Sequence, residues 1–217
     1  MKTITAIKLF TVFLFASAQV NAASVSYFLD QSNDLADGTN YAKVTISDSI
    51  GHAGDIEFAV EVLTGAFPTP LSNFGMQSFY FNADDGLAVS AANLVDINPS
   101  WSVNTDKNPG GGFGKFDFEV AGNGSNRTEL LTFRISDVTG DTIDSYALNS
   151  VLQDEEGTPG VYFAAHIADY DSVVSGNTSG KFGGSSVVPI PAAVWLFASG
   201  LGFLGWRGRK TILNQAS

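Results

Sequence analysis

Residues 115–120 read Lys115-Phe116-Asp117-Phe118-Glu119-Val120, so apolar and charged side chains alternate along the stretch. Successive side chains of a strand point to opposite faces, and this alternation is typical of a strand with one buried and one wet face. The stretches 56–62 and 131–135 alternate in the same way. All three predict β-strands that each bury one face.

Less regular strand patterns occur elsewhere, separated by turn-forming Gly, Asn and Asp residues. They cover residues 25–29, 41–46, 76–81, 87–89, 101–103 and 161–167. Asn123-Gly124 lies between the segments 113–120 and 128–135 and predicts a hairpin that joins them. Many short strands with intervening turns predict an all-β domain, an antiparallel β-sandwich of about eight or nine strands.

The chain is acidic, with 22 Asp and Glu residues against 11 Lys and Arg residues. Five of the basic residues lie in the two terminal segments described below, which hold no acidic residue, so the rest of the chain has six basic residues and a net charge of −16. We expect no nucleic-acid partner, because binding to phosphates requires clustered Lys and Arg. Since the chain has no cysteine, the domain must be stabilised without disulfides.

The first 22 residues have the composition of a secretory signal peptide. Lys2 and Lys8 precede an apolar stretch at 9–18, and small residues stand before the junction of Ala22 and Ala23. This pattern predicts cleavage by signal peptidase between Ala22 and Ala23, and export of the remaining chain.

The C-terminal region contains an apolar segment between prolines and basic residues. It begins with Val188-Pro189-Ile190-Pro191, and its apolar part, 190–206, is 17 residues long. A helix needs roughly 20 apolar residues to cross a bilayer core, so this segment predicts a short C-terminal transmembrane helix in the inner membrane. The basic residues that follow, Arg207, Arg209 and Lys210, predict that this end stays cytoplasmic.

The order of these parts resembles the PEP-CTERM sorting signal of Gram-negative bacteria, in which a Pro-Glu-Pro-like motif precedes a transmembrane stretch and a basic cluster. Here Ile190 stands at the position of the Glu, and residues 211–217 follow the basic cluster as a short cytoplasmic tail. The resemblance implies processing by an exosortase, a membrane-embedded enzyme associated with extracellular polysaccharide production. A permanent membrane anchor of the same orientation is the alternative.

These segments divide the chain into five parts. Residues 1–22 form the signal peptide, 23–171 the β-sandwich domain, 172–187 a flexible linker, 188–210 the sorting signal and 211–217 the tail. The linker is expected because its sequence is rich in Ser, Gly, Asn and Thr. A last edge strand around residues 180–182 is the alternative for this stretch.

The sequence contains no recognisable catalytic set. It has two histidines, His52 and His166, and lacks the Gly-x-Ser-x-Gly motif of α/β-hydrolases. Glu57 and Glu61 share a strand face but lie about 13 Å apart by strand rise, too far to act as a carboxylate pair. We expect no enzymatic activity and no catalytic residues. A hydrolase with His166 and a carboxylate in one pocket is an alternative.

Two features suggest ligand binding. Asp30, Asp34 and Asp37 place three carboxylates close together in the sequence, and Ca²⁺ takes six to eight oxygen ligands; turn formation explains the same residues. Trp101 is the only tryptophan outside the terminal segments and is a candidate to stack on a sugar ring; core packing is the other interpretation. No cofactor besides Ca²⁺ is suggested.

Three functions are consistent with the sequence. The first is a non-enzymatic exported protein, anchored in the inner membrane before processing and then found at the cell surface or in an extracellular matrix with polysaccharide. The second is a carbohydrate- or Ca²⁺-dependent binding module, and the third is a hydrolase of unrecognised type. We adopt the first as our prediction, because the targeting segments carry the most specific patterns in the chain.

Overall fold

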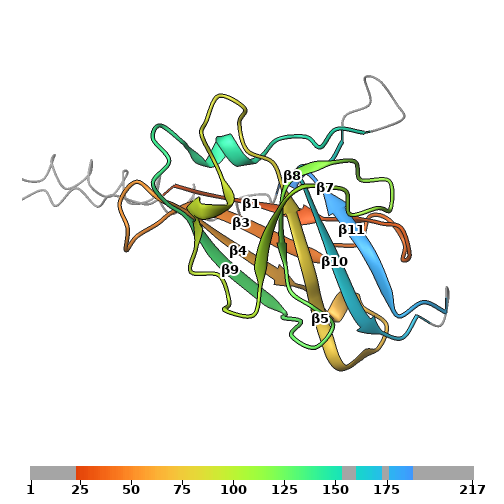
Figure 1. Cartoon of the computed structure of the whole chain (residues 1–217). Coiled ribbons are helices and arrows are strands. Elements are labelled where there is room, and N and C mark those ends of the chain that lie inside the picture. Colours follow the sequence, from red (N-terminus) through yellow and green to blue (C-terminus); the bar gives the residue numbers. More distant parts are fainter. Residues whose placement is uncertain (1–22, 153–159, 173–175, 188–217) are drawn as a thin grey trace, which may run out of the picture.

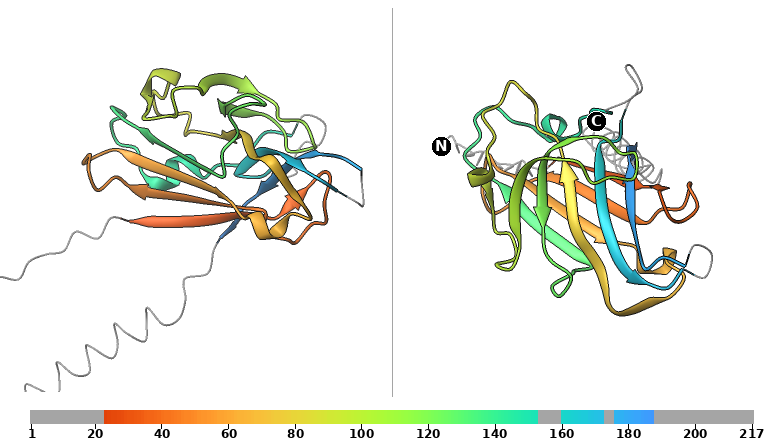
Figure 2. Two further views of the ribbon diagram at one scale, coloured as in Figure 1. Left: turned by 90° about the horizontal axis from the view of Figure 1, so that it is seen from below. Right: turned by 45° about the vertical axis from the view of Figure 1, so that its right-hand side comes forward.

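The computed structural model describes residues 23–152, 160–172 and 176–187. Within them the chain forms twelve strands and three short 3-10 helices, and no α-helix. The strands make two antiparallel sheets of six strands each (Figure 1). The left view of Figure 2 shows the sheets as two layers. The prediction of an all-β fold built from antiparallel sheets is confirmed.

The first sheet has the strand order β12-β1-β3-β4-β9-β6. Its strands are β12 (Ser186–Val187), β1 (Ser24–Leu29), β3 (Ala42–Asp48), β4 (Ile56–Val62), β9 (Leu130–Ile135) and β6 (Leu94–Val95). In β4 Ile56, Phe58, Val60 and Val62 are buried, whereas Glu57 and Glu61 are exposed. The prediction of a strand with one buried and one wet face is therefore confirmed for this stretch.

The second sheet has the strand order β2-β11-β10-β5-β8-β7. Its strands are β2 (Gln31–Ser32), β11 (Ser179–Gly184), β10 (Phe163–Tyr170), β5 (Pro70–Phe81), β8 (Phe116–Ala121) and β7 (Ser102–Lys107). The 12-residue β5 is paired with β10 on one side and β8 on the other. The 3-10 helices are η1 (Thr64–Ala66), η2 (Ala91–Asn93) and η3 (Ile143–Tyr146).

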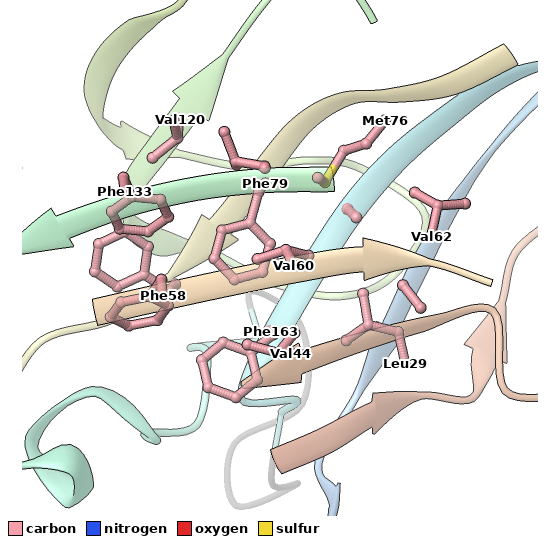
Figure 3. Close-up of a cluster of buried hydrophobic side chains, with 14 of the residues drawn as sticks. Leu29, Val44, Phe58, Val60, Val62, Met76, Phe79, Val120, Phe133 and Phe163 are labelled. Atoms are coloured by element: carbon pink, nitrogen blue, oxygen red, sulfur yellow. The ribbon is translucent and has the colours of Figure 1, made fainter. Parts of the chain in front are cut away.

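The inner faces of the two sheets meet in one core of aromatic and aliphatic side chains (Figure 3). Phe58 of β4 stacks on Phe133 of β9, with ring centroids 4.7 Å apart. Phe81, from β5 of the other sheet, has its ring centroid 5.1 Å from that of Phe58. All three rings are buried. Because buried aromatic rings contribute strongly to stability, these contacts bind the two sheets together.

Most of the predicted strands are present. Nine strands have six residues or more, in line with the about eight or nine that the turn spacing predicted. The prediction of a strand at 87–89 is wrong, since these residues form no strand. Leu87 and Val89 instead pack against the core from a loop. These residues are apolar because they pack against the core, although they form no hydrogen-bonded strand.

The predicted hairpin between segments 113–120 and 128–135 is also wrong. β8 pairs with β5 and β7 in the second sheet, whereas β9 pairs with β4 and β6 in the first. The turn at Asn123-Gly124 therefore carries the chain from one sheet to the other. It is held by the indole of Trp101, which donates a hydrogen bond to the carbonyl of Asn126 at 3.0 Å.

The prediction of a flexible linker over 172–187 is wrong, because strands β11 and β12 lie in this range. β11 pairs with β10 over six residues and with β2 on its other side. Phe182 is fully buried, with its ring centroid 4.7 Å from that of Tyr41. The alternative of a strand around 180–182 describes this stretch. Its glycines permit close packing: a Cβ at Gly184 would lie 2.3 Å from the carbonyl oxygen of Phe28.

The predicted targeting segments cannot be compared with the structure, because residues 1–22, 188–210 and 211–217 lie outside the described residues. Among the residues that are described, no helix has the length and apolarity needed to cross a membrane.

Replacing Phe58 by Ala tests the contact between the sheets. The Phe58 side chain has no exposed surface, so we expect the F58A variant to lose about 3–5 kcal/mol in free energy of unfolding, measured by urea denaturation. Ile50→Ala is the matched control, because Ile50 is 93% exposed and its truncation should change stability by less than about 0.5 kcal/mol. Equal effects of the two substitutions would contradict this account of the core.

Candidate functional site

The outer face of the second sheet, which is turned away from the core, gathers polar and basic side chains from five strands. Directly paired residues of an antiparallel sheet share a face. Lys181, His166 and Ser78 are paired in one row across β11, β10 and β5. The next row pairs residues of β5, β8 and β7. We refer to six of these residues as the polar face: Lys181, His166, Ser78, Tyr80, Glu119 and Asn104.

A chain of hydrogen bonds joins four residues of the polar face. The Ser78 hydroxyl donates to Tyr80 Oη at 2.9 Å, and the Tyr80 hydroxyl donates to Glu119 Oε1 at 2.6 Å. The other carboxylate oxygen, Oε2, accepts from Asn104 Nδ2 at 2.9 Å. Burial and the bond to Glu119 raise the pKa of Tyr80, so its phenol stays protonated and fixes the position of Glu119.

The remaining two residues of the polar face are basic and only half-buried. Burial lowers the pKa of Lys181 to about 8, although the charge of Glu119 acts in the opposite direction. Burial, followed by the positive charges of Lys181 and Arg127, lowers the pKa of His166 to about 4. At neutral pH, Lys181 is therefore mostly charged and His166 is neutral.

Neither of these basic side chains has a polar partner in the described part of the chain. Lys181 Nζ and the His166 imidazole form no ion pair and no hydrogen bond there. Arg127, in the loop after β8, donates only to uncharged groups: to Gln77 Oε1 at 3.4 Å and to the carbonyl of Asn73 at 3.3 Å. Arg134, on the other sheet, is instead paired with Asp55 and Asp96.

The glycine-rich loop at 108–114 packs against one end of the polar face. Gly111 has a φ of +72°, which favours glycine, and a Cβ there would lie 2.9 Å from Lys181 Cβ and 3.3 Å from the Asn33 side chain. Phe113 of the same loop packs on Gly183, where a Cβ would lie 2.6 Å from its ring. A small second core forms beneath the loop from Tyr80, Phe113, Phe116, Val161 and Ala164. The loop thus packs against the base of the Lys181 side chain.

The structure does not bring together the three carboxylates considered for calcium. Asp34 accepts hydrogen bonds from the Tyr170 hydroxyl and Asn177 Nδ2, both at 2.7 Å. Asp37 Oδ1 accepts from the backbone N–H of Ser32 at 2.8 Å, and Asp30 Oδ2 accepts from the Ser186 hydroxyl at 2.6 Å.

In these bonds the carboxylates close the 30–38 loop and attach it to neighbouring strands. No group of three or more His, Asp and Glu side chains suited to a metal ion occurs in the part of the chain that the structure describes. Binding of Ca²⁺ at Asp30, Asp34 and Asp37 stays a prediction.

Trp101 is a core residue, so the interpretation as a stacking platform for sugars is corrected. Its side chain is only 7% exposed. The ring packs on Gly122, where a Cβ would lie 2.6 Å from the indole, and its N–H bonds to Asn126. An aromatic ring must expose one face to stack on a pyranose, and this ring does not.

A hydrolase would require His166 and a carboxylate in one pocket, and the structure meets this requirement only in part. His166 and Glu119 lie on the same sheet face, but Glu119 is occupied by Tyr80 and Asn104. A nucleophile and base must be in hydrogen-bond reach, with the base oriented by a third group. Ser78 donates to Tyr80 rather than to His166, so the described arrangement is not a catalytic triad.

Comparison with known protein families, with curated proteins and with solved structures finds no match for this chain.

Within the polar face, the sequence pattern points to His166 but gives no signal for Lys181 or Ser78. Lys181 lay in the presumed linker, and Ser78 lay in a segment with no strict alternation. The residues come from five strands whose pairing brings them into two rows. Alternation identifies the outward residues of a strand, whereas their neighbours depend on strand order.

His166 should make the protein sensitive to acid. Its folded-state pKa of about 4 lies below the ordinary 6.5, so the unfolded chain takes up this proton first as the pH falls below 6.5, and stability is lost until about pH 4. We expect wild type to lose about 1–2 kcal/mol more between pH 7 and pH 4 than the His166→Gln variant, after allowance for partial exposure.

The measurement is urea denaturation at several pH values. His52→Gln is the control, because His52 is exposed in the loop between β3 and β4. If His166→Gln and His52→Gln follow the same pH profile, His166 is not the buried neutral group described here.

Proposed function

We propose that this chain is a non-enzymatic exported protein, which its PEP-CTERM-like tail directs to the cell surface or an extracellular matrix containing polysaccharide. One observation supports this most directly: the strands of the described residues lie between the two predicted targeting segments. The first strand begins at Ser24, next to the predicted cleavage site at Ala22 and Ala23. The last described strand, Ser186–Val187, directly precedes Val188-Pro189-Ile190-Pro191 in the sequence.

The pairing of the first and last strands adds to this argument. β12 is antiparallel to β1, with Val187 opposite Tyr27 and Ser186 opposite Phe28. The last described residues therefore lie beside the first strand, at one edge of the first sheet. Ser186 and Val187 are both exposed, so the sorting motif would begin at an accessible edge of the domain. In this proposal, signal peptidase and exosortase act next to the folded body.

Mass spectrometry of the mature C-terminus in a native host tests the sorting step. We expect protein in the surface fraction to lack Arg207, Arg209 and Lys210, because cleavage at the Pro189-Ile190-Pro191 motif removes the membrane segment. The Pro191→Ala variant should stay mostly in the membrane fraction. Pro99→Ala is the control, because Pro99 is an exposed loop proline far from the motif in sequence.

An intact Lys210 in the surface fraction would contradict processing. Wild-type protein that stays wholly in the inner membrane would support the permanent anchor instead.

A carbohydrate-binding module is the second candidate, and the polar face is the observation that favours it. Since Trp101 is buried, binding would depend on hydrogen bonds and charge rather than on ring stacking. A glycan array, probed with and without Ca²⁺, separates this candidate from a protein without a glycan ligand. Binding that requires Ca²⁺ would point to Asp30, Asp34 and Asp37, and Ca²⁺-independent binding would point to the polar face.

A further inference from the structure

The polar face and the neighbouring Arg127 bring together basic groups that form no ion pair in the described structure. Lys181 lies directly opposite His166 across β10 and β11, and basic groups placed opposite each other in a sheet are unfavourable when both are charged. Arg127 is close enough to lower the pKa of His166 further. The chain outside its terminal segments has only six Lys and Arg residues for 22 Asp and Glu residues, so carboxylates to neutralise them are abundant. Glu119 lies close enough to act on the pKa of Lys181, but its two oxygens accept hydrogen bonds from Tyr80 and Asn104, and no carboxylate forms an ion pair with Lys181 or Arg127 in the described structure.

We propose that the polar face, together with the neighbouring Arg127, binds the carboxylate of an acidic sugar unit in a polysaccharide, with Lys181 and Arg127 as the cationic contacts and His166 as a hydrogen-bond partner. An ammonium and a guanidinium are the side chains that bind carboxylates most strongly in proteins, through charge-assisted hydrogen bonds. The bound carboxylate would supply the ion-pair partner that Lys181 and Arg127 do not have in the described structure.

His166 suits a sugar that carries hydroxyl groups beside its carboxylate. A neutral imidazole has one donor and one acceptor nitrogen, so it can serve a hydroxyl group in either direction. At neutral pH His166 is in this form, since its pKa is about 4. Gln77 and Asn33, at the two ends of the row, add further uncharged polar groups next to Arg127 and Lys181.

The surroundings favour a saccharide over an acidic peptide. Protein partners bind through an apolar centre surrounded by a polar rim. The large hydrophobic side chains that are exposed in the described residues are Ile50, Leu71, Leu130, Val151 and Val187. Of these, only Leu71 belongs to a strand of the polar face, β5, where it lies seven residues before Ser78. The polar face thus lacks the apolar anchor that a peptide would need.

The glycine-rich loop pre-organises the main cationic contact. Gly111 lies against Cβ of Lys181, at the base of its stem, and the Lys181 backbone N–H donates to Asn33 Oδ1 at 2.7 Å. A flexible lysine loses considerable rotamer entropy when it is immobilised. Packing of the stem removes part of that cost before the ligand arrives.

This inference takes its biological setting from the proposed surface role, but binding is measured on the purified protein and does not depend on sorting. The experiment is isothermal titration calorimetry of the full chain in detergent micelles at pH 7. The probes are trigalacturonic acid, its uncharged methyl ester and a glutamate-rich peptide. We expect the acid to bind, and the ester and peptide to bind at least about tenfold more weakly.

The variants locate the site. Lys181→Gln should weaken binding of trigalacturonic acid about tenfold, because one charge-assisted hydrogen bond is lost, and Lys181→Arg should retain most of the affinity. Lys43→Gln is the matched control: Lys43 is a half-buried lysine on the first sheet, opposite Glu61. Urea denaturation of each variant verifies folding.

Three results would overturn the proposal: no binding of the acid, equal binding of the acid and its ester, or equal loss in Lys181→Gln and Lys43→Gln. Tighter binding of the peptide would assign the polar face to an acidic protein partner instead. None of these results bears on C-terminal processing, so failure here leaves the sorting proposal standing.

The pH dependence of binding gives a second readout. The charged or titratable groups around Lys181 are His166 on β10, Glu119 on β8 and Arg127 in the following loop. Because the pKa of Lys181 is about 8, its charge is lost above that pH, and affinity should fall between pH 7 and pH 9.5. The Lys181→Arg variant should keep its affinity over this range, since a guanidinium stays protonated. Parallel pH profiles of the two proteins would contradict the assignment of Lys181 as the cationic contact.

Discussion

The contact of Phe58 with Phe133 and Phe81 is the interaction on which the rest of this structure depends. It joins neighbouring strands of the first sheet to the central strand of the second, in a protein without cysteine. It also fixes register, because a slip by one residue would turn each buried ring outward and expose it to water. By fixing the register, the core also determines which side chains lie on the outer faces of the sheets.

The outer faces of the two sheets differ in how their charged side chains are paired. On the first sheet, charges are paired or matched: Lys43 lies opposite Glu61, and Arg134 bonds to two aspartates. On the second sheet, Lys181 and His166 share a half-buried row without a carboxylate partner. Burial of unpaired basic groups costs stability, and proteins tend to accept such local costs at functional sites. This asymmetry is the main physical reason to assign function to the second sheet.

The sequence predicted the fold well where strands have one buried and one wet face. Residues 56–62 alternate strictly and form β4 with the expected burial. The prediction failed where the structure depends on contacts between residues that are far apart in the sequence. Asn123-Gly124 looks like a hairpin turn but joins two sheets, since alternation does not encode the partner strand. The glycines of β11 look like linker residues, although they are small because Phe113 and the β1 backbone lie against them.

The central claim is that the polar face of the second sheet, and not the 30–38 loop, is the ligand-binding surface. NMR spectroscopy of the full chain during titration with trigalacturonic acid tests it most directly. We expect the largest chemical-shift changes at the His166 imidazole and at the amides of residues 179–183 and of their hydrogen-bond partner Asn33, with little change at Asp30, Asp34 and Asp37. Changes confined to Asp30, Asp34 and Asp37, or none at His166, would contradict this claim.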